Sequence, residues 1–233
     1  MCLLVRHGHS TANADGILSG WTPGIGLTER GIAQAADVAA QVVGVPVVRV
    51  VSSPLDRCLA TAAPLAAATG LEVEVDDAFG ECHYGAWTGR PLKELADDPL
   101  WRVVQDDPAT ARFPESAAYP SESLGEMVAR LTSVHRRVDE AVTAAHGPTA
   151  VWVAVSHGDP IKSLLASAVG AGVTGLQRVH VDPGSVSVIQ MVGGRSMVLA
   201  TNRSARSLAD LLPAPRGSET GQAGDAVVGG GAG

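Results

Sequence analysis

Short, continuously apolar segments alternate along the chain with longer segments of helical periodicity. CLLV (residues 2–5), VVRVVSS (47–53) and AVWVAVS (150–156) contain few polar side chains. Such segments are typical of strands that are buried on both faces of a parallel sheet. LEVEV (71–75) alternates apolar and polar residues and predicts one more strand.

The segments between these strands predict helices with capping residues at their ends. Thr28 is the expected N-cap of the helical pattern LTERGIAQAADVAAQVV. A second helix is expected over residues 54–69 and ends at Gly70. Ser53 is its expected N-cap, with Pro54 in its first turn.

Two further helices are expected in the second half of the chain. Ser123 and Glu126 form the signature of a capping box, which predicts a long helix that ends near position 146. HGDP (157–160) leads from the last buried strand into another helix. Asp159 is the expected cap of that helix, with Pro160 at its first position.

The remaining segments give a hairpin and a loop-rich insertion. Residues 185–192 and 196–201 predict a β-hairpin that turns at Gly193–Gly194. Residues 76–120 contain short helical segments between proline and aspartate residues. A loop-rich, cap-like insertion of this kind often covers an active site.

These elements predict an α/β fold: a mostly parallel central sheet flanked by helices, in three α/β/α layers. We expect one domain over residues 1–203. Residues 204–233 are rich in Gly, Ala, Ser and Pro, and we expect a disordered tail there.

Composition narrows the class of protein. The 233-residue chain is 45% hydrophobic and 18% charged, as is ordinary for a soluble globular protein, and its apolar runs are shorter than a membrane span. Its net charge of −7 argues against a nucleic-acid-binding protein, which usually has a basic face. We expect no signal peptide, and the 3 cysteines fit reduced thiols. A soluble cytoplasmic protein without nucleic-acid or membrane partners is therefore expected.

Polar residues follow three of the expected strands where those strands end. His7 follows the first strand, Ser52–Ser53 ends the second, and His157 follows AVWVAVS. Ligands in open α/β sheets bind beyond the carboxyl ends of the strands. We expect these residues to share one rim of the sheet, with Arg57 one helical turn below it.

The residue types at this rim suit phosphoryl transfer through histidine. Arg6 and Arg57 carry planar guanidinium groups, which bind phosphate bidentately. A neutral imidazole is able to attack phosphorus, and both His7 and His157 supply one. Glu81, held protonated, is able to supply the proton that a leaving alkoxide needs. None of these steps requires a metal ion or another cofactor.

Five motifs, in this order, resemble the phosphoglycerate-mutase-like branch of the histidine phosphatase superfamily. They span roughly residues 2 to 202 and are RHGHSTAN (6–13), LTERGIAQA (27–35), SSPLDRCLATA (52–62), ECHYGAWTGR (81–90) and VSHGDPIK (155–162). The resemblance implies the fold expected above and an enzyme that acts on a small phosphorylated metabolite. The resemblance leaves open whether the protein forms a homodimer.

The resemblance also implies roles for individual residues. His7 matches the family's nucleophile, Arg6, Arg57 and His157 match the residues that hold the phosphate, and Glu81 matches the proton donor. Contacts with the phosphate or the substrate are assigned to a further set: Ser10, Asn13, Ser19, Gly20, Tyr84, Arg90 and Gly158. For Arg90 a solvated surface role is an equal alternative, and His9 faces either the pocket or solvent.

Two other readings of the same residues stay open at this point. A metallohydrolase would use His7-x-His9 and His157-x-Asp159 as ligand pairs, but it leaves the arginines unexplained. A silent phosphate-binding module would need neither a nucleophile nor an acid.

Within the family, the sequence favours a phosphatase over a mutase. Cys82 stands where the similar mutase motif ERHYG has arginine, and no arginine-rich segment follows Trp101. A mutase needs contacts to a second phosphate and a lid that excludes water.

Overall fold

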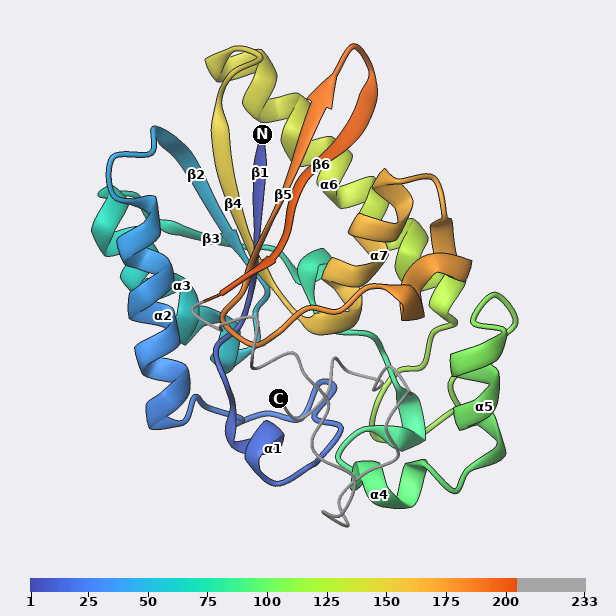
Figure 1. Cartoon of the computed structure of the whole chain (residues 1–233). Coiled ribbons are helices and arrows are strands. Elements are labelled where there is room, and N and C mark those ends of the chain that lie inside the picture. The colour runs from blue at the N-terminus through green and yellow to red at the C-terminus, as the bar shows by residue number, and fades with distance from the viewer. Residues whose placement is uncertain (205–233) are drawn as a thin grey trace, which may run out of the picture.

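Six strands form one sheet in the computed structural model, which describes residues 1–204 (Figure 1). The strands are β1 (Cys2–Arg6), β2 (Val47–Ser52), β3 (Val73–Val75), β4 (Val151–Ser156), β5 (Val186–Val192) and β6 (Arg195–Arg203). Their order is β3-β2-β4-β1-β5-β6, in which the first four are parallel and the β5–β6 hairpin is antiparallel. The predicted, mostly parallel sheet and its terminal hairpin are confirmed.

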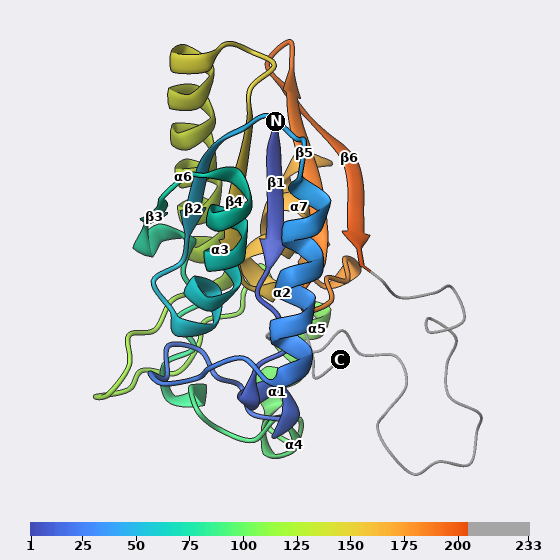
Figure 2. The same cartoon turned by 90° about the vertical axis from the view of Figure 1, so that its left-hand side faces the viewer.

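Helices cover both faces of this sheet, which gives three layers. The helices are α1 (Thr11–Ala14), α2 (Glu29–Val42), α3 (Asp56–Thr69), α4 (Leu92–Leu95), α5 (Pro99–Asp106), α6 (Leu124–His146) and α7 (Gly158–Ala168). Helices α2 and α3 lie on one face of the sheet, and α6 and α7 lie on the other (Figure 2).

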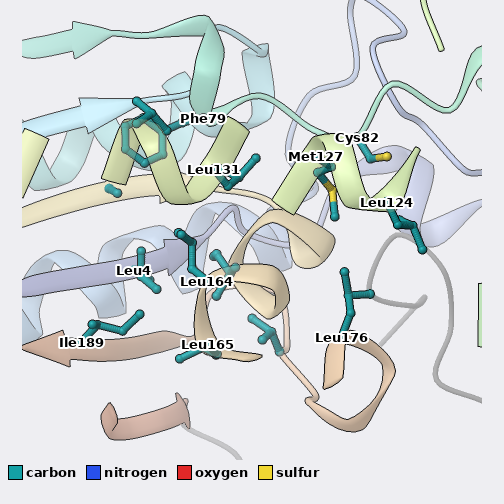
Figure 3. Packing of buried hydrophobic residues seen from close by; sticks show 14 of the residues in the cluster. Leu4, Phe79, Cys82, Leu124, Met127, Leu131, Leu164, Leu165, Leu176 and Ile189 are labelled. Carbon is teal, nitrogen blue, oxygen red and sulfur yellow. The ribbon is translucent and has the colours of Figure 1, made fainter. Parts of the chain in front are cut away.

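Each face of the sheet has its own hydrophobic core. Val5 and Val153 pack with Leu65 on the α2–α3 side. Leu4 packs on the opposite side with residues of α6 and α7 such as Leu131 and Leu165 (Figure 3). Because neighbouring residues of β1 enter different cores, this strand must be apolar at nearly every position, which explains the continuous run CLLV.

Three of the expected helix ends are confirmed. The Thr28 hydroxyl accepts a hydrogen bond from the Gly31 N–H at the start of α2. Ser123 and Glu126 form the predicted capping box of α6. Gly70 ends α3 in the left-handed conformation, with φ of 71°.

Two other helix starts were predicted wrongly. Helix α3 begins at Asp56 with Leu55 as its N-cap, so Ser53 and Pro54 precede it. Helix α7 begins at Gly158, and its N-cap, His157, makes no side-chain capping bond. In both cases the side chain expected to cap, that of Ser53 or Asp159, is hydrogen-bonded to a residue outside its own helix.

Residues 76–120 form the expected loop-rich insertion, with the 3-10 turns η1 (Asp77–Phe79) and η2 (Gly85–Trp87) ahead of α4 and α5. A third such turn, η3 (Gly172–Arg178), follows α7. Trp87 and Trp101 are buried inside the insertion, with ring centroids 6.2 Å apart, and contribute to its core. The predicted tail lies outside the described residues apart from its first one, Ser204. No helix within residues 1–204 is long and apolar enough to cross a membrane.

Candidate active site

The carboxyl ends of three parallel strands meet at one rim of the sheet. Arg6 at the end of β1 pairs with Ser156 at the end of β4, and Ser52 at the end of β2 pairs with Val155. Beyond the strands, the His7 N–H donates to the Ser156 carbonyl at 3.0 Å. The predicted convergence of three strand ends is therefore confirmed.

His7 is buried, and only one of its ring nitrogens has a hydrogen-bond partner in the structure. Its Nδ1 lies 2.8 Å from the Gly8 carbonyl oxygen, an acceptor, so Nδ1 carries the proton and Nε2 keeps its lone pair. Burial lowers the pKa of His7 well below its usual value, and the positive charges of Arg57 and Arg6 lower it further. His7 is therefore a neutral imidazole at neutral pH, as a nucleophile must be.

Gly8 lets the chain pass close to α2 directly after His7. A Cβ atom at Gly8 would lie 2.4 Å from the Gly31 carbonyl oxygen, closer than side-chain carbons come to other atoms. The Gly8 N–H donates to Thr61 Oγ1 of α3 at 3.0 Å. Contacts to α2 and α3 thus hold the backbone that carries His7.

Two arginines are buried beside His7. Arg6 donates from Nη1 to the Val181 carbonyl at 2.7 Å, and Arg57 donates from Nη2 to the Gly20 carbonyl at 2.8 Å. The Nε and Nη1 atoms of Arg57 are buried and have no hydrogen-bond partner among the described residues. Because buried donors are nearly always paired, these two N–H-bearing atoms make the position suited to accept an anion.

His157 lies next to His7 at the end of β4. The two ring centroids are 5.2 Å apart in an edge-to-face arrangement. The Nε2 atom of His157 is 2.7 Å from Ser53 Oγ, and its Nδ1 is 3.9 Å from Glu81 Oε2. Burial lowers the pKa of His157 well below its usual value, and the charge of Arg57 adds to this effect.

Glu81 supplies a carboxyl group that titrates near neutrality. Burial, and after it the charge of the neighbouring Asp159, raises its pKa to about 7 against the opposing charge of Arg57. The Cys82 N–H donates to Glu81 Oε1 at 2.9 Å. A carboxyl with this pKa is able both to give a proton and to take one back at neutral pH.

The backbone of Glu81 is held by residues distant in sequence. The Trp21 indole N–H donates to the Glu81 carbonyl at 2.8 Å. Arg130 of α6 donates to the carbonyls of Ala78 and Gly80 at 2.9 and 3.1 Å, and its Nη2 lies 2.6 Å from Glu122. Sequence reasoning missed Arg130 and Glu122, because a charged pair eight residues apart normally indicates only a solvated surface.

Asp159 belongs to a buried polar network beside Glu81. The Tyr84 hydroxyl donates to Asp159 Oδ2 at 2.7 Å, and Lys162 Nζ donates to Asp159 Oδ1 at 3.2 Å. All three residues are at most 1% exposed. The side chain predicted to cap α7 thus joins the insertion to α7 instead.

The remaining candidate residues differ in their placement. Ser10 is buried and caps α1 together with Asn13, while Ser19 is half-buried and adjoins Gly20. Gly158 is buried at the start of α7, and the hydroxyl of Tyr84 is bonded to Asp159. Arg90 has a side chain that is 43% exposed and lies 3.8 Å from Glu94, away from the buried cluster. The predicted contacts of these residues with the phosphate or the substrate stay predictions.

The residues of the metal-site alternative are engaged in other contacts. His9 Nδ1 lies 3.0 Å from the Thr28 hydroxyl, and Asp159 is bonded as described above. Within residues 1–204, no three His, Cys, Asp or Glu side chains are grouped so that they could hold a metal ion.

Comparison with protein families gives one match over almost the whole described chain. The model of the histidine phosphatase superfamily (branch 1) matches residues 2–204. A bifunctional protein of Mycobacterium tuberculosis is 35% identical over 208 residues, which are 87% of this chain and 53% of that protein. The chain therefore spans about half the length of the first curated relatives that it matches.

Other relatives include a phosphatase and several mutases. Phosphoserine phosphatase 1 of Hydrogenobacter thermophilus is 30% identical, over 86% of this chain and 90% of its own length. A 2,3-bisphosphoglycerate-dependent phosphoglycerate mutase of Thermoplasma acidophilum is 27% identical, over 85% of this chain and 91% of its own length.

Similar solved structures include two that are named as phosphatases. One is a mycobacterial glucosyl-3-phosphoglycerate phosphatase in complex with VO3, 26% identical over 87% of this chain and 98% of that one, with a TM-score of 0.74. Another is a putative α-ribazole-5'-phosphate phosphatase of Escherichia coli. It is 25% identical over 87% of this chain and 95% of its own chain, with a TM-score of 0.74.

Proposed function

The chain belongs to the histidine phosphatase superfamily (branch 1), and from this membership and the geometry above we propose that it is a phosphomonoester hydrolase with His7 as nucleophile. The observation that carries the proposal is the buried cluster in which the neutral His7 adjoins Arg57, whose Nε and Nη1 have no partner among the described residues. His7 provides a lone pair that is able to attack phosphorus, and Arg57 provides N–H donors for the phosphoryl oxygens.

The first half-reaction transfers the phosphoryl group to the enzyme. His7 Nε2 attacks phosphorus, the bond between phosphorus and the ester oxygen breaks, and the Glu81 carboxyl protonates the leaving alkoxide. Arg6, Arg57 and His157 hold the equatorial oxygens while charge shifts onto them. The products are an alcohol, a phosphohistidine and the Glu81 carboxylate.

The second half-reaction returns the enzyme to its starting state. The Glu81 carboxylate takes a proton from water, whose oxygen attacks phosphorus, and the bond between phosphorus and Nε2 breaks. Inorganic phosphate leaves, and Glu81 is again protonated. A pKa of about 7 suits a carboxyl that must act as an acid and then as a base. No step uses a metal ion.

The burial of Cys82 supports hydrolysis rather than mutase chemistry. The Cys82 thiol packs in the hydrophobic core near Met127 and Leu124 (Figure 3), so it offers no charge to a second phosphate. Water then accepts the phosphoryl group. The names of the relatives favour a small phosphorylated metabolite as substrate, such as phosphoserine or a phosphoglycerate derivative.

A hydrolysis screen tests the proposal. The wild-type chain, with and without chelator, is offered p-nitrophenyl phosphate, phosphoserine, phosphoglycerates, glucosyl-3-phosphoglycerate and phosphorylated cofactors, and released phosphate is measured. We expect turnover that chelator leaves unchanged, and a loss of at least about 1000-fold in His7→Ala. His146→Ala, an exposed histidine at the end of α6, is the matched control.

Three results would contradict parts of this proposal. Wild-type rates in His7→Ala would remove the nucleophile assignment. Activity that chelator abolishes and zinc restores would replace it with the metallohydrolase. Interconversion of phosphoglycerates faster than their hydrolysis would identify a mutase.

A further inference from the structure

Ser53 touches His157 but has no part in the two half-reactions. It follows β2, is fully buried, and donates its N–H to the Val155 carbonyl at 2.9 Å, which places it beside the end of β4. Its Oγ atom lies 2.7 Å from His157 Nε2. The Nε2 atom of His157 is therefore hydrogen-bonded to a hydroxyl group, which is able both to donate and to accept.

The surroundings of Ser53 decide the direction of this hydrogen bond. Its Oγ also accepts a long hydrogen bond from the Leu55 N–H, at 3.4 Å. If the ring N–H donated to Oγ, the buried hydroxyl proton would be left with only the Cys58 sulfur, which is a weak acceptor. If the hydroxyl donates to Nε2 instead, every strong donor and acceptor of Ser53 is used. The second direction is therefore favoured.

Cys58 leaves this arrangement undisturbed. Its thiol donates to the Ser156 carbonyl at 3.5 Å, so the sulfur lone pairs face the ring of His157. The sulfur lies 3.4 Å from Nε2 and 3.8 Å from Nδ1. No proton from Cys58 thus competes for Nε2, which remains the acceptor of the Ser53 hydroxyl.

We propose that Ser53 is a positioning residue that sets the tautomer of His157, with the ring proton on Nδ1, so that this nitrogen donates to a phosphoryl oxygen. Nδ1 is the nitrogen on the Glu81 side, 3.9 Å from Oε2. The inference rests on the proposed function, because phosphate is the expected acceptor. A neutral ring has one proton, and with that proton on Nε2 the Nδ1 lone pair would repel a phosphoryl oxygen.

Nitrogen NMR tests the tautomer independently of activity. Protein with ¹⁵N-labelled histidine is recorded as wild type, Ser53→Ala and Ser53→Thr, with His157→Gln to assign the signals. We expect a protonated Nδ1 and a bare Nε2 on His157 in the wild type, and a Nδ1–H resonance that shifts when inorganic phosphate is added. Ser53→Ala should move the ring toward the Nε2–H form, and Ser53→Thr, which keeps the hydroxyl, should restore the wild-type form.

Ser52→Ala is the matched control, because the Ser52 hydroxyl donates to the Ser53 carbonyl at 2.9 Å and not to His157. It should leave the tautomer unchanged. In kinetics, Ser53→Ala should lower kcat for a phosphomonoester by about tenfold while Ser53→Thr recovers most of it.

The outcomes separate this inference from the proposed function. A Nε2–H ring in the wild type overturns the inference even if Ser53→Ala does not fold. An unchanged tautomer in a folded Ser53→Ala overturns it as well. If the wild type hydrolyses no phosphomonoester but the tautomer and the phosphate-induced shift are as expected, the proposed function fails and the role of Ser53 stands.

Discussion

Histidine side chains are buried at both ends of the central sheet, and at the carboxyl end their neighbours are cations. Burial lowers the pKa values of His7 and His157, and the charge of Arg57 lowers them further. Two donor-bearing atoms of Arg57 have no partner within the described chain. These guanidinium donors thus lie beside two imidazoles whose pKa values are lowered, an arrangement suited to an anion.

The amino end of the sheet buries a histidine, His135, beside a hydrogen-bonded aspartate, and its Nε2 has no partner among the described residues. His135 of α6 lies beside Trp152, with ring centroids 5.4 Å apart. The Trp152 indole N–H donates to Asp139 at 2.9 Å, and the Met1 amino group is 3.9 Å from the same carboxylate. Burial lowers the pKa of His135 too, but Asp139 opposes the shift. A cavity of about 610 Å³ between α6 and the β5–β6 hairpin adjoins this cluster.

The two ends of the sheet differ in the guanidinium donors that are left without a partner among the described residues. A buried histidine with a lowered pKa occurs at both ends and therefore does not distinguish them. Unsatisfied cationic donors, in contrast, converge only at the carboxyl rim among the residues compared here. We therefore interpret the amino-end cluster as structural.

Replacing Arg57 at the carboxyl end and His135 at the amino end should show the largest difference between the two clusters. We expect Arg57→Met to lower kcat/KM by about 100- to 1000-fold, because it removes donors to the transition state. Its melting temperature should not fall, since buried donors without partners cost stability. His135→Phe should keep activity within about twofold. Phosphatase assays with thermal unfolding of both variants check this, and a fully active Arg57→Met would refute the assignment.

The stability of the folded protein should depend on pH through Glu81. Its pKa of about 7 lies above its usual 4.5, so the folded state binds this proton more tightly than the unfolded state. Stability from this group is therefore complete below pH 4.5 and is lost as pH rises toward 7.

Activity should follow the same proton. For substrates with poor leaving groups, kcat/KM should fall about tenfold per pH unit above 7, because Glu81 must be protonated in the free enzyme. In Glu81→Gln, the fall of kcat/KM above pH 7 should disappear. The loss of activity in this variant should be smaller for aryl phosphates than for substrates with poor leaving groups. A pH profile that stays flat to pH 9 in the wild type would exclude Glu81 as the acid.

The smallest effect is expected from Asp159, which acts on Glu81 through its charge. Asp159→Asn should lower the pKa of Glu81, so the alkaline limb of kcat/KM should move to lower pH by up to about one unit. The hydrogen bond from Tyr84 can still form to the amide oxygen. Lys93→Ala on the surface is a control that should leave the limb in place. An unshifted limb in Asp159→Asn would show that burial alone raises this pKa.

Local sequence signals predicted most of the fold. Continuous apolar runs identified β1, β2 and β4, because a strand buried on both faces has no polar side to display. Capping signals located the ends of α2 and α6, since these depend on residues three or four positions apart.

The same signals were wrong where a polar residue has a partner far away in sequence. Ser53 and Asp159 have the side chains of helix caps, yet Ser53 bonds His157 and Asp159 bonds Tyr84. A capping rule considers only the next few residues, so it cannot detect a competing partner across the sheet. Arg130 had only the weak signal of a charged partner eight residues away, Glu122, while its carbonyl acceptors lie about 50 residues away, just before Glu81.

Residue type and spacing are enough to place polar residues after three parallel strands, at the ends where ligands bind, and to match them to the nucleophile and phosphate ligands of a known family. Their chemical state, in contrast, depends on the tertiary structure. The raised pKa of Glu81, the neutral rings of His7 and His157, and the unpartnered donors of Arg57 all result from burial among residues distant in the chain. Loss of water and nearby charge set a proton affinity, and both depend on three-dimensional packing rather than on spacing along the chain.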